Sequence, residues 1–146
     1  MKRITKERLL NAGWTKTRKI NITKIQDKYQ EAEMNLPDNV INFLSEYGYL
    51  VFNDEDRTED VEFIPEKAIG CNLDKEYFEE LLEEYDINET VYPVGTTCRE
   101  NLTIVMTVEN VFYCFTDGYL EKAGDCVEDM LDCLVGECRE AEILVN

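Results

Sequence analysis

The chain has 146 residues, of which 44% are hydrophobic and 10% aromatic, and its formal net charge is −17. This size and composition predict a single globular domain, residues 1–146, with a substantial core. No run of about 20 apolar residues could span a bilayer. The basic N-terminal stretch also lacks the apolar block of a signal peptide, so we expect a cytoplasmic protein with no membrane partner.

Charge is distributed unevenly along the chain. Residues 1–30 contain nine Lys and Arg against Glu7 and Asp27, a balance of +7, so the remaining 116 residues carry −24. Because phosphates are held by Lys and Arg, the acidic body argues against nucleic acid as its ligand. It favours a basic partner, or serves only solubility. The opposite charges would also favour contact between the N-terminal segment and the acidic body.

Cysteine and histidine usage argues against a disulfide scaffold and against a zinc site. The cysteines form no Cys-x-x-Cys pair, and there is no histidine to complete a mixed zinc site. A chain of this size without an export signal does not need disulfides, so we expect free, buried thiols. The six cysteines are Cys71, Cys98, Cys114, Cys126, Cys133 and Cys138.

The motifs of common enzymes and cofactor sites are missing. The sequence lacks a histidine base, a nucleophile elbow, a phosphate-binding loop and a dinucleotide-binding glycine motif, so we expect neither catalysis nor a cofactor. The alternation of Asp54 and Asp56 suits the start of a calcium loop, but Glu59 stands where that loop requires glycine. We therefore expect no metal site. An enzyme that uses paired carboxylates alone stays open as an alternative.

The N-terminal quarter is predicted to be mostly helical. Residues 5–12 form a short helix with Thr5 as its cap, and Trp14 follows it with its ring packed into the edge of the core. Residues 15–22 are basic and extended, and residues 23–34 form a second helix.

The central element is a helix that leads directly into a strand. Pro37 suits the first helical turn, and Gly48 can adopt the left-handed conformation that ends a helix. Between them, apolar residues recur at helical spacing and form the stripe Val40, Ile41, Phe43, Leu44 and Tyr47. Residues 49–53 form the strand, and residues 61–65 form a second strand beside it.

A further helix is predicted over residues 74–86, with Asp74 as its cap. Its buried stripe consists of Tyr77, Phe78, Leu81, Leu82 and Tyr85. The opposite face carries like charges one turn apart, and several acids lie near the negative end of the helix dipole, where they cost stability. A basic partner would explain this arrangement, and so would general acidity.

Antiparallel strands dominate the C-terminal half. A strand at residues 90–95 is followed by a hairpin at residues 102–115 with a two-residue turn, Glu109-Asn110. The predicted register places Leu102, Ile104 and Met106 opposite Val111, Tyr113 and Phe115, and leaves the other face only partly covered. The chain continues with an Asp117-Gly118 turn, an edge strand, a helix at residues 124–135 and a second edge strand in the tail. The predicted fold is therefore α+β, with a mainly antiparallel sheet flanked by helices.

Three motifs occur in the order expected for one family. They are Gly13-Trp14 after a short helix, Leu36-Pro37 before a helix that closes on Tyr47-Gly48, and the segment Tyr92-Pro93-Val94-Gly95 before a hairpin. Together they resemble the SUKH superfamily, most closely its third group. The resemblance implies a single α+β domain that neutralises a cognate secreted bacterial toxin by direct binding, and many such toxins are basic nucleases.

Charge counting, rather than the resemblance, supplies the candidate binding residues. They are Asp54, Glu55, Asp56, Glu59 and Asp60 in a loop, and Glu76, Glu79, Glu80, Glu83 and Glu84 on a helix. We predict that these acids cover the phosphate-binding groove of a basic nuclease toxin. The alternative is a regulatory adaptor of the same fold with a basic partner unrelated to any toxin. The oligomeric state, and any separate partner of the basic N-terminal segment, stay open.

Overall fold

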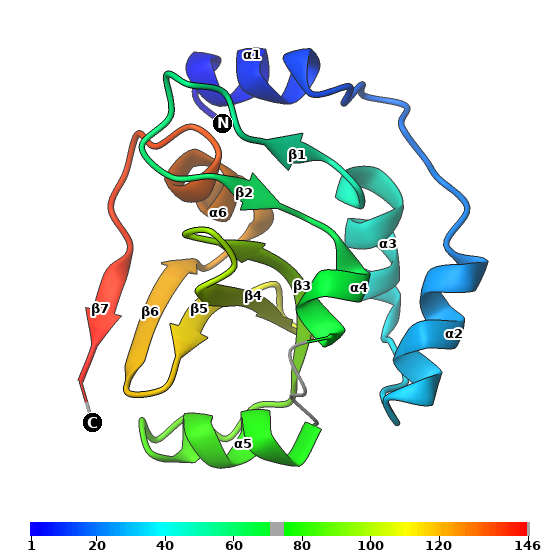
Figure 1. Ribbon diagram of the computed structural model, residues 1–146, viewed down its shortest axis with the longest axis vertical. Helices are drawn as coiled ribbons and strands as arrows, with labels where there is room; N and C mark the ends of the chain where they lie inside the picture. The colour runs from blue at the N-terminus through cyan, green and yellow to red at the C-terminus, as the bar shows by residue number, and fades with distance from the viewer. Residues whose placement is uncertain (71–74, 146) are drawn as a thin grey trace.

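Seven antiparallel strands form one sheet in which the spatial order follows the sequence order, β1 to β7. The computed structural model describes residues 1–70 and 75–145 (Figure 1). The strands are β1 (Val51–Phe52), β2 (Val61–Glu62), β3 (Val91–Thr97), β4 (Leu102–Thr107), β5 (Phe112–Thr116), β6 (Tyr119–Gly124) and β7 (Glu142–Leu144). Each strand therefore pairs with its neighbour in the sequence.

Helices flank this sheet, so the predicted α+β class is confirmed. Within the described residues they are α1 (Arg3–Asn11), α2 (Thr23–Glu31), α3 (Asp38–Tyr47), α4 (Pro65–Ile69), α5 (Lys75–Glu83) and α6 (Val127–Leu134). None of these helices is long and apolar enough to cross a membrane.

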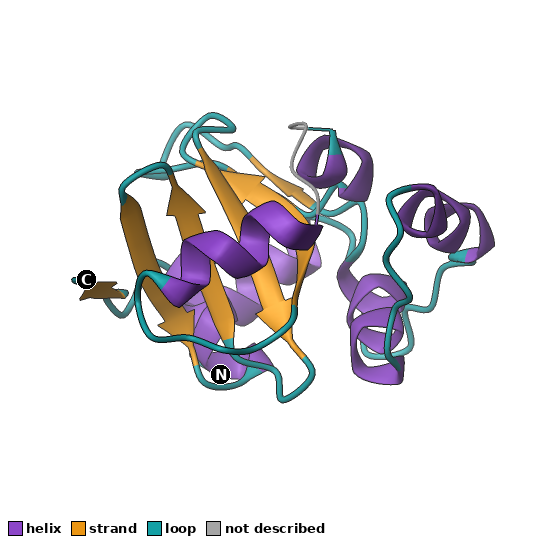
Figure 2. Cartoon of the chain, turned by 90° about the horizontal axis from the view of Figure 1, so that it is seen from below, coloured by secondary structure: helices purple, strands orange, loops and turns teal. Residues whose placement is uncertain are grey.

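Both faces of the sheet are covered, which corrects the expectation of one partly covered face. On one face, the Phe78 ring of α5 packs edge-on against Phe115, with their centroids 5.3 Å apart. On the other face, the Phe43 ring of α3 lies 5.3 Å from Phe112. Figure 2 shows α5 crossing one side of the sheet with helices behind it. Every residue of β4 is consequently buried.

The predicted register of the β4–β5 hairpin is wrong by one residue. Met106 pairs with Phe112 and Ile104 pairs with Cys114, so Phe112 and Cys114 share the face that was assigned to Tyr113 and Phe115. The cause is the turn, which is longer than the two residues expected. The Thr107 hydroxyl accepts hydrogen bonds from the backbone N–H groups of residues 109 and 111, at 3.2 and 3.1 Å, and so organises a wider loop.

The end of α3 uses its glycine differently from the prediction. Gly48 has φ −56°, and the left-handed residue is Tyr49, with φ 68°. Gly48 is needed instead for close approach, because a Cβ atom there would lie 2.4 Å from the Leu44 carbonyl oxygen. The helix itself begins at Asp38, one residue after Pro37.

Several N-terminal predictions need correction, whereas the Trp14 prediction is confirmed. Helix α1 begins at Arg3, and Thr5 is a buried residue rather than a cap. No strand forms between residues 15 and 22, and α2 ends at Glu31. Trp14 is 5% exposed and its Nε1 donates to a Glu46 carboxylate oxygen at 2.9 Å.

Further differences concern the ends of elements. Strand β2 is shorter than expected because Pro65 begins α4, a helix that was not predicted. Strand β6 is not an edge, since β7 pairs with its outer side and forms the edge expected in the tail. Helix α6 begins at Val127, three residues later than predicted. The predicted cap Asp74 lies outside the described residues.

The prediction of free thiols is confirmed for the described cysteines, whereas the prediction that they are buried holds for only two of them. Five cysteines are described and all are free, but only Cys114 and Cys133 are buried. Cys126 and Cys138 are exposed, and Cys98 is partly buried. Burial raises the pKa of Cys133 to about 11, so this thiol stays protonated at neutral pH. Cys71 lies outside the described residues.

Candidate partner-binding surface

The acidic face of α5 forms where the sequence predicted it. Phe78 and Leu82 are fully buried and hold the helix on the sheet, with Tyr77 donating a hydrogen bond to Asp117 at the β5–β6 turn. That hydrogen bond is the main reason why the pKa of Tyr77 rises to about 12. The four acids Glu76, Glu80, Glu83 and Glu84 are exposed, and Glu79 is partly buried.

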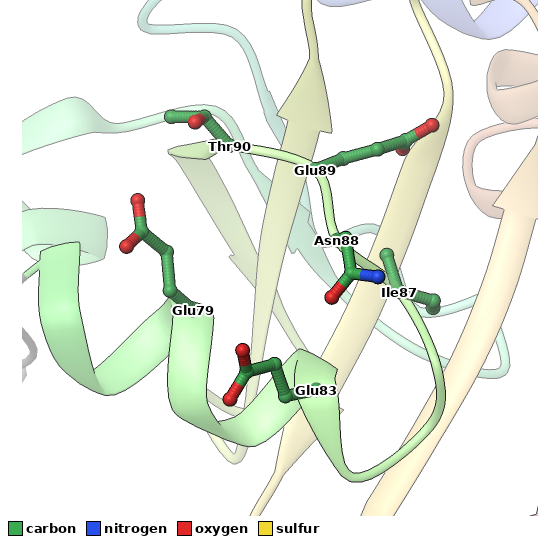
Figure 3. A pocket seen from close by; sticks show the side chains of 6 residues that line it. All are labelled: Glu79, Glu83, Ile87, Asn88, Glu89 and Thr90. Atoms are coloured by element: carbon green, nitrogen blue, oxygen red, sulfur yellow. The ribbon is translucent and has the colours of Figure 1, made fainter.

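A small hollow adjoins this face. It measures about 260 Å³ and is lined by Glu79, Glu83, Ile87, Asn88, Glu89 and Thr90. Figure 3 shows Glu79 and Glu83 rising from α5 toward the segment that follows the helix, whereas Glu89 points away from them. The hollow can accept hydrogen bonds from a lysine or arginine of a partner. Its apolar lining is limited to Ile87, so it offers little area for hydrophobic contact.

The loop between β1 and β2, residues 53–60, is anchored on the C-terminal end of α6. The Arg57 side chain is only 3% exposed. It donates hydrogen bonds to the carbonyl oxygens of Leu134 and Val135 at 2.7 and 2.6 Å, which satisfies carbonyls that have no partner inside the helix. The loop is also held by the carboxylate of Glu137, which follows α6. This carboxylate accepts hydrogen bonds from the backbone N–H groups of Thr58 and Glu59 at 3.1 to 3.2 Å.

Glu137 also joins the loop to the N-terminal helix. The Arg8 guanidinium donates to Glu137 at 3.1 Å and to the Val135 carbonyl oxygen at 2.8 Å. A network of Arg8, Arg57 and Glu137 therefore holds together α1, the 53–60 loop and the end of α6. The expected contact between the basic segment and the acidic body exists here. Glu137 carried no sequence signal, because it lies in an irregular tail without periodicity.

The arginines of the basic segment contact the body more than its lysines do. Arg18 donates to the carbonyl oxygen of Gly48 at 2.8 Å. Lysines 16, 19, 24 and 28 are exposed and make no ion pair within the described residues. Arg8 and Arg18 thus hold the segment in place, whereas Arg3 is exposed and pairs only with Glu7 of the same helix, and the four lysines face solvent.

The two predicted groups of acids do not form one surface. The 53–60 loop is bound to α6, whereas α5 covers the face of the sheet that carries Phe115. Figure 1 shows the loop and α5 at opposite ends of the view, with the sheet between them. Within the loop, Asp54, Glu55, Asp56 and Glu59 are exposed. Asp60 is partly buried, and its carboxylate accepts the backbone N–H of Arg99 at 2.7 Å.

No group of three or more His, Cys, Asp or Glu side chains could hold a metal ion within residues 1–70 and 75–145. The fold is a small α+β protein with a sequential antiparallel sheet, and exposed carboxylates lie on the 53–60 loop and along α5. A family model described as SUKH-3 immunity protein matches residues 1–137, so the chain belongs to the SUKH-3 immunity protein family. Membership implies a cognate toxin as its partner. The chain has no significant match among curated proteins or among solved structures.

Proposed function

We propose that this chain binds a cognate secreted bacterial toxin, a basic nuclease, and neutralises it through an acidic surface. The family supports toxin immunity, and the net charge of −17 supports a basic partner. The single observation that carries the choice of a nuclease is the set of exposed carboxylates on the 53–60 loop and along α5, which can take the place of phosphates in a phosphate-binding groove.

Inhibition then follows from occupation of the nucleic-acid site. Carboxylates on the immunity protein take the place of phosphates on the toxin's Lys and Arg side chains, so the substrate is excluded. Opposite charge on the two proteins also speeds their encounter, by one or more orders of magnitude at low salt. Fast association matters because the toxin must be captured before it reaches nucleic acid.

The remaining features of the proposal concern context. We infer that the chain acts as one domain in the cytoplasm of the producing cell, by binding and without catalysis. The binding residues proposed from charge are the five acids of the 53–60 loop, the four glutamates 76, 79, 80 and 83 of α5, and Glu84 directly after the helix. Their separation across the sheet implies that one toxin domain engages one of the two groups as its main contact.

The test is co-purification of the tagged chain from its native host at low and at high salt. We expect recovery of one basic nuclease that kills cells or degrades nucleic acid alone and is inactive at one-to-one stoichiometry. High salt should weaken the complex. Recovery of only housekeeping proteins, or a toxin whose activity is unchanged by the chain, would refute the proposal and favour the adaptor alternative.

A further inference from the structure

A larger acidic groove lies on the α6 side of the sheet. It consists of two hollows of about 560 and 400 Å³ that share Glu59 and Cys98. We call them together the acidic groove. Its walls come from the 53–60 loop, the β3–β4 turn, β6 and the end of α6. The residues used below are Asp54, Glu59, Cys98, Leu102, Tyr119, Glu121 and Leu134.

The walls of the groove are fixed by internal contacts. Arg57 and Glu137 hold the loop against α6, as described above. The Thr97 hydroxyl donates to the Asp60 carbonyl oxygen at 2.7 Å, which ties the same loop to β3. On the opposite wall, the Tyr119 hydroxyl donates to the Glu121 carboxylate at 2.7 Å. A partner would therefore meet a preformed groove, with little ordering cost on this side.

Some acids of the groove already have cationic partners and others do not. Glu62 pairs with Lys67 at 2.8 Å, and Glu137 pairs with Arg8. Asp54, Glu59 and Glu121 make no ion pair within the part of the chain that the structure describes. Among the described residues, Arg57 and Arg99 also line the larger hollow, but neither forms an ion pair with these three carboxylates, which can therefore still accept a cation from a partner.

The floor of the groove differs from the α5 surface by being partly apolar. Leu102, Leu134 and Tyr119 line it beside the partly buried Glu121. Interface energy concentrates in pockets that lose their water, whereas exposed rim charges contribute little. A carboxylate beside an apolar floor can thus contribute more to affinity than the exposed glutamates of α5.

We propose that the acidic groove is the principal docking site for the toxin and that it takes a segment in which a Lys or Arg side chain lies next to an apolar side chain. This inference rests on the proposed function. The cation meets Glu59 and Glu121, and the apolar side chain packs on Leu102 and Leu134. The α5 face then serves mainly to steer the encounter, so it affects the association rate more than the lifetime of the complex.

The test compares two double variants with the same change in charge. The groove variant is Glu59→Gln with Glu121→Gln, and the matched control is Glu80→Gln in α5 with Glu84→Gln directly after it. Binding is measured with the toxin domain that co-purifies with the wild-type chain. We expect the groove variant to bind about tenfold or more weakly through faster dissociation, and the control to lose affinity much less, through slower association. Circular dichroism and urea unfolding check that both variants are folded.

Alkylation of Cys98 gives an independent measurement. In a background with Cys71, Cys126 and Cys138 changed to Ser, Cys98 is the most accessible described thiol, since Cys114 and Cys133 are buried. We expect bound toxin to protect Cys98 from N-ethylmaleimide, and prior alkylation to weaken binding.

The outcomes separate the two proposals. One outcome is a toxin that binds the wild type, leaves Cys98 reactive and loses more affinity with the α5 variant than with the groove variant. This outcome would refute docking in the acidic groove and would leave the proposed immunity function intact. If no toxin binds the wild type, the proposed function fails and the groove inference fails with it. Selective loss with the groove variant, together with protection of Cys98, supports the groove.

Discussion

Replacing Arg57 by Ala should destabilise the protein by about 3 kcal/mol. The guanidinium makes two short hydrogen bonds to carbonyl oxygens at the end of α6, and its centre lies 5.7 Å from the ring centroid of Phe52. A hydrogen bond from a charged group is worth roughly 1.5–3 kcal/mol, and breaking a buried ionic contact costs roughly 3–5 kcal/mol. Folding of the alanine variant no longer removes a guanidinium from water, and this saving offsets part of the gross loss, which gives a net value of about 3 kcal/mol.

Urea unfolding followed by circular dichroism measures this loss. For a chain of this length, about 3 kcal/mol corresponds to a fall in Tm of roughly 6–12 °C. The matched control is Arg99→Ala, which removes the same charge from an exposed side chain at the β3–β4 turn and should cost less than about 0.5 kcal/mol. Arg57→Lys should fall between them, because an ammonium cannot reproduce the guanidinium fork.

A difference of less than about 1 kcal/mol between Arg57→Ala and Arg99→Ala would refute the reasoning. It would mean that water satisfies the carbonyl oxygens of α6 as well as Arg57 does, and that the 53–60 loop does not depend on its anchor. The groove would then lack the fixed wall on which the docking inference relies.

Three other variants test separate contacts. Gly48→Ala should lower the free energy of unfolding in urea by about 3 kcal/mol, because the new Cβ would clash with a helix carbonyl oxygen. Gly13→Ala should lower it by only about 1 kcal/mol, because Gly13 has a positive φ but open space around it. A larger loss for Gly13→Ala than for Gly48→Ala would contradict the close approach at Gly48. Trp14→Phe should cost about 1.5 kcal/mol by removing the hydrogen bond to Glu46, and an unchanged midpoint would show that this bond is not stabilising. Burial alone would raise the pKa of Asp132, but hydrogen bonds from a buried hydroxyl and a backbone N–H hold it below its usual value. The stability that the ionised Asp132 contributes is therefore present above the unfolded pKa of about 3.9 and is lost as the pH falls through the lower folded pKa. We expect Asp132→Asn to be less stable than the wild type at neutral pH. In urea unfolding at acidic pH, the variant should lose less stability than the wild type does.

The elements that could be predicted are those with strong periodicity. In α3 the stripe of Val40, Phe43, Leu44 and Tyr47 is buried, and in α5 Phe78 and Leu82 are fully buried. In both helices the apolar spacing matches a single face, so tertiary structure and local preference agree. The acidic face of α5 followed from the same periodicity.

What could not be predicted depended on contacts between distant residues. The β4–β5 register failed because the side chain of Thr107 builds the turn, and no turn motif marks that position. The role of Glu137 depends on Arg8 and Arg57, which are more than 75 residues away in the sequence. Glu121 was not among the predicted acids because one charge on a strand resembles any solvent-facing residue. It became a candidate only when the fold placed it beside Leu102 and Leu134.

The sequential order of the strands has a consequence for how the chain folds. Neighbouring strands close short loops, but Thr5 must reach Asp132 across 127 positions, and closing so long a loop costs more entropy. We expect the sheet to form first and α1 to dock last, so that changes at this contact mainly accelerate unfolding. During synthesis the contact between Thr5 and Asp132 cannot form until α6 has left the ribosome, so the N-terminal helix is made first but gains this contact late.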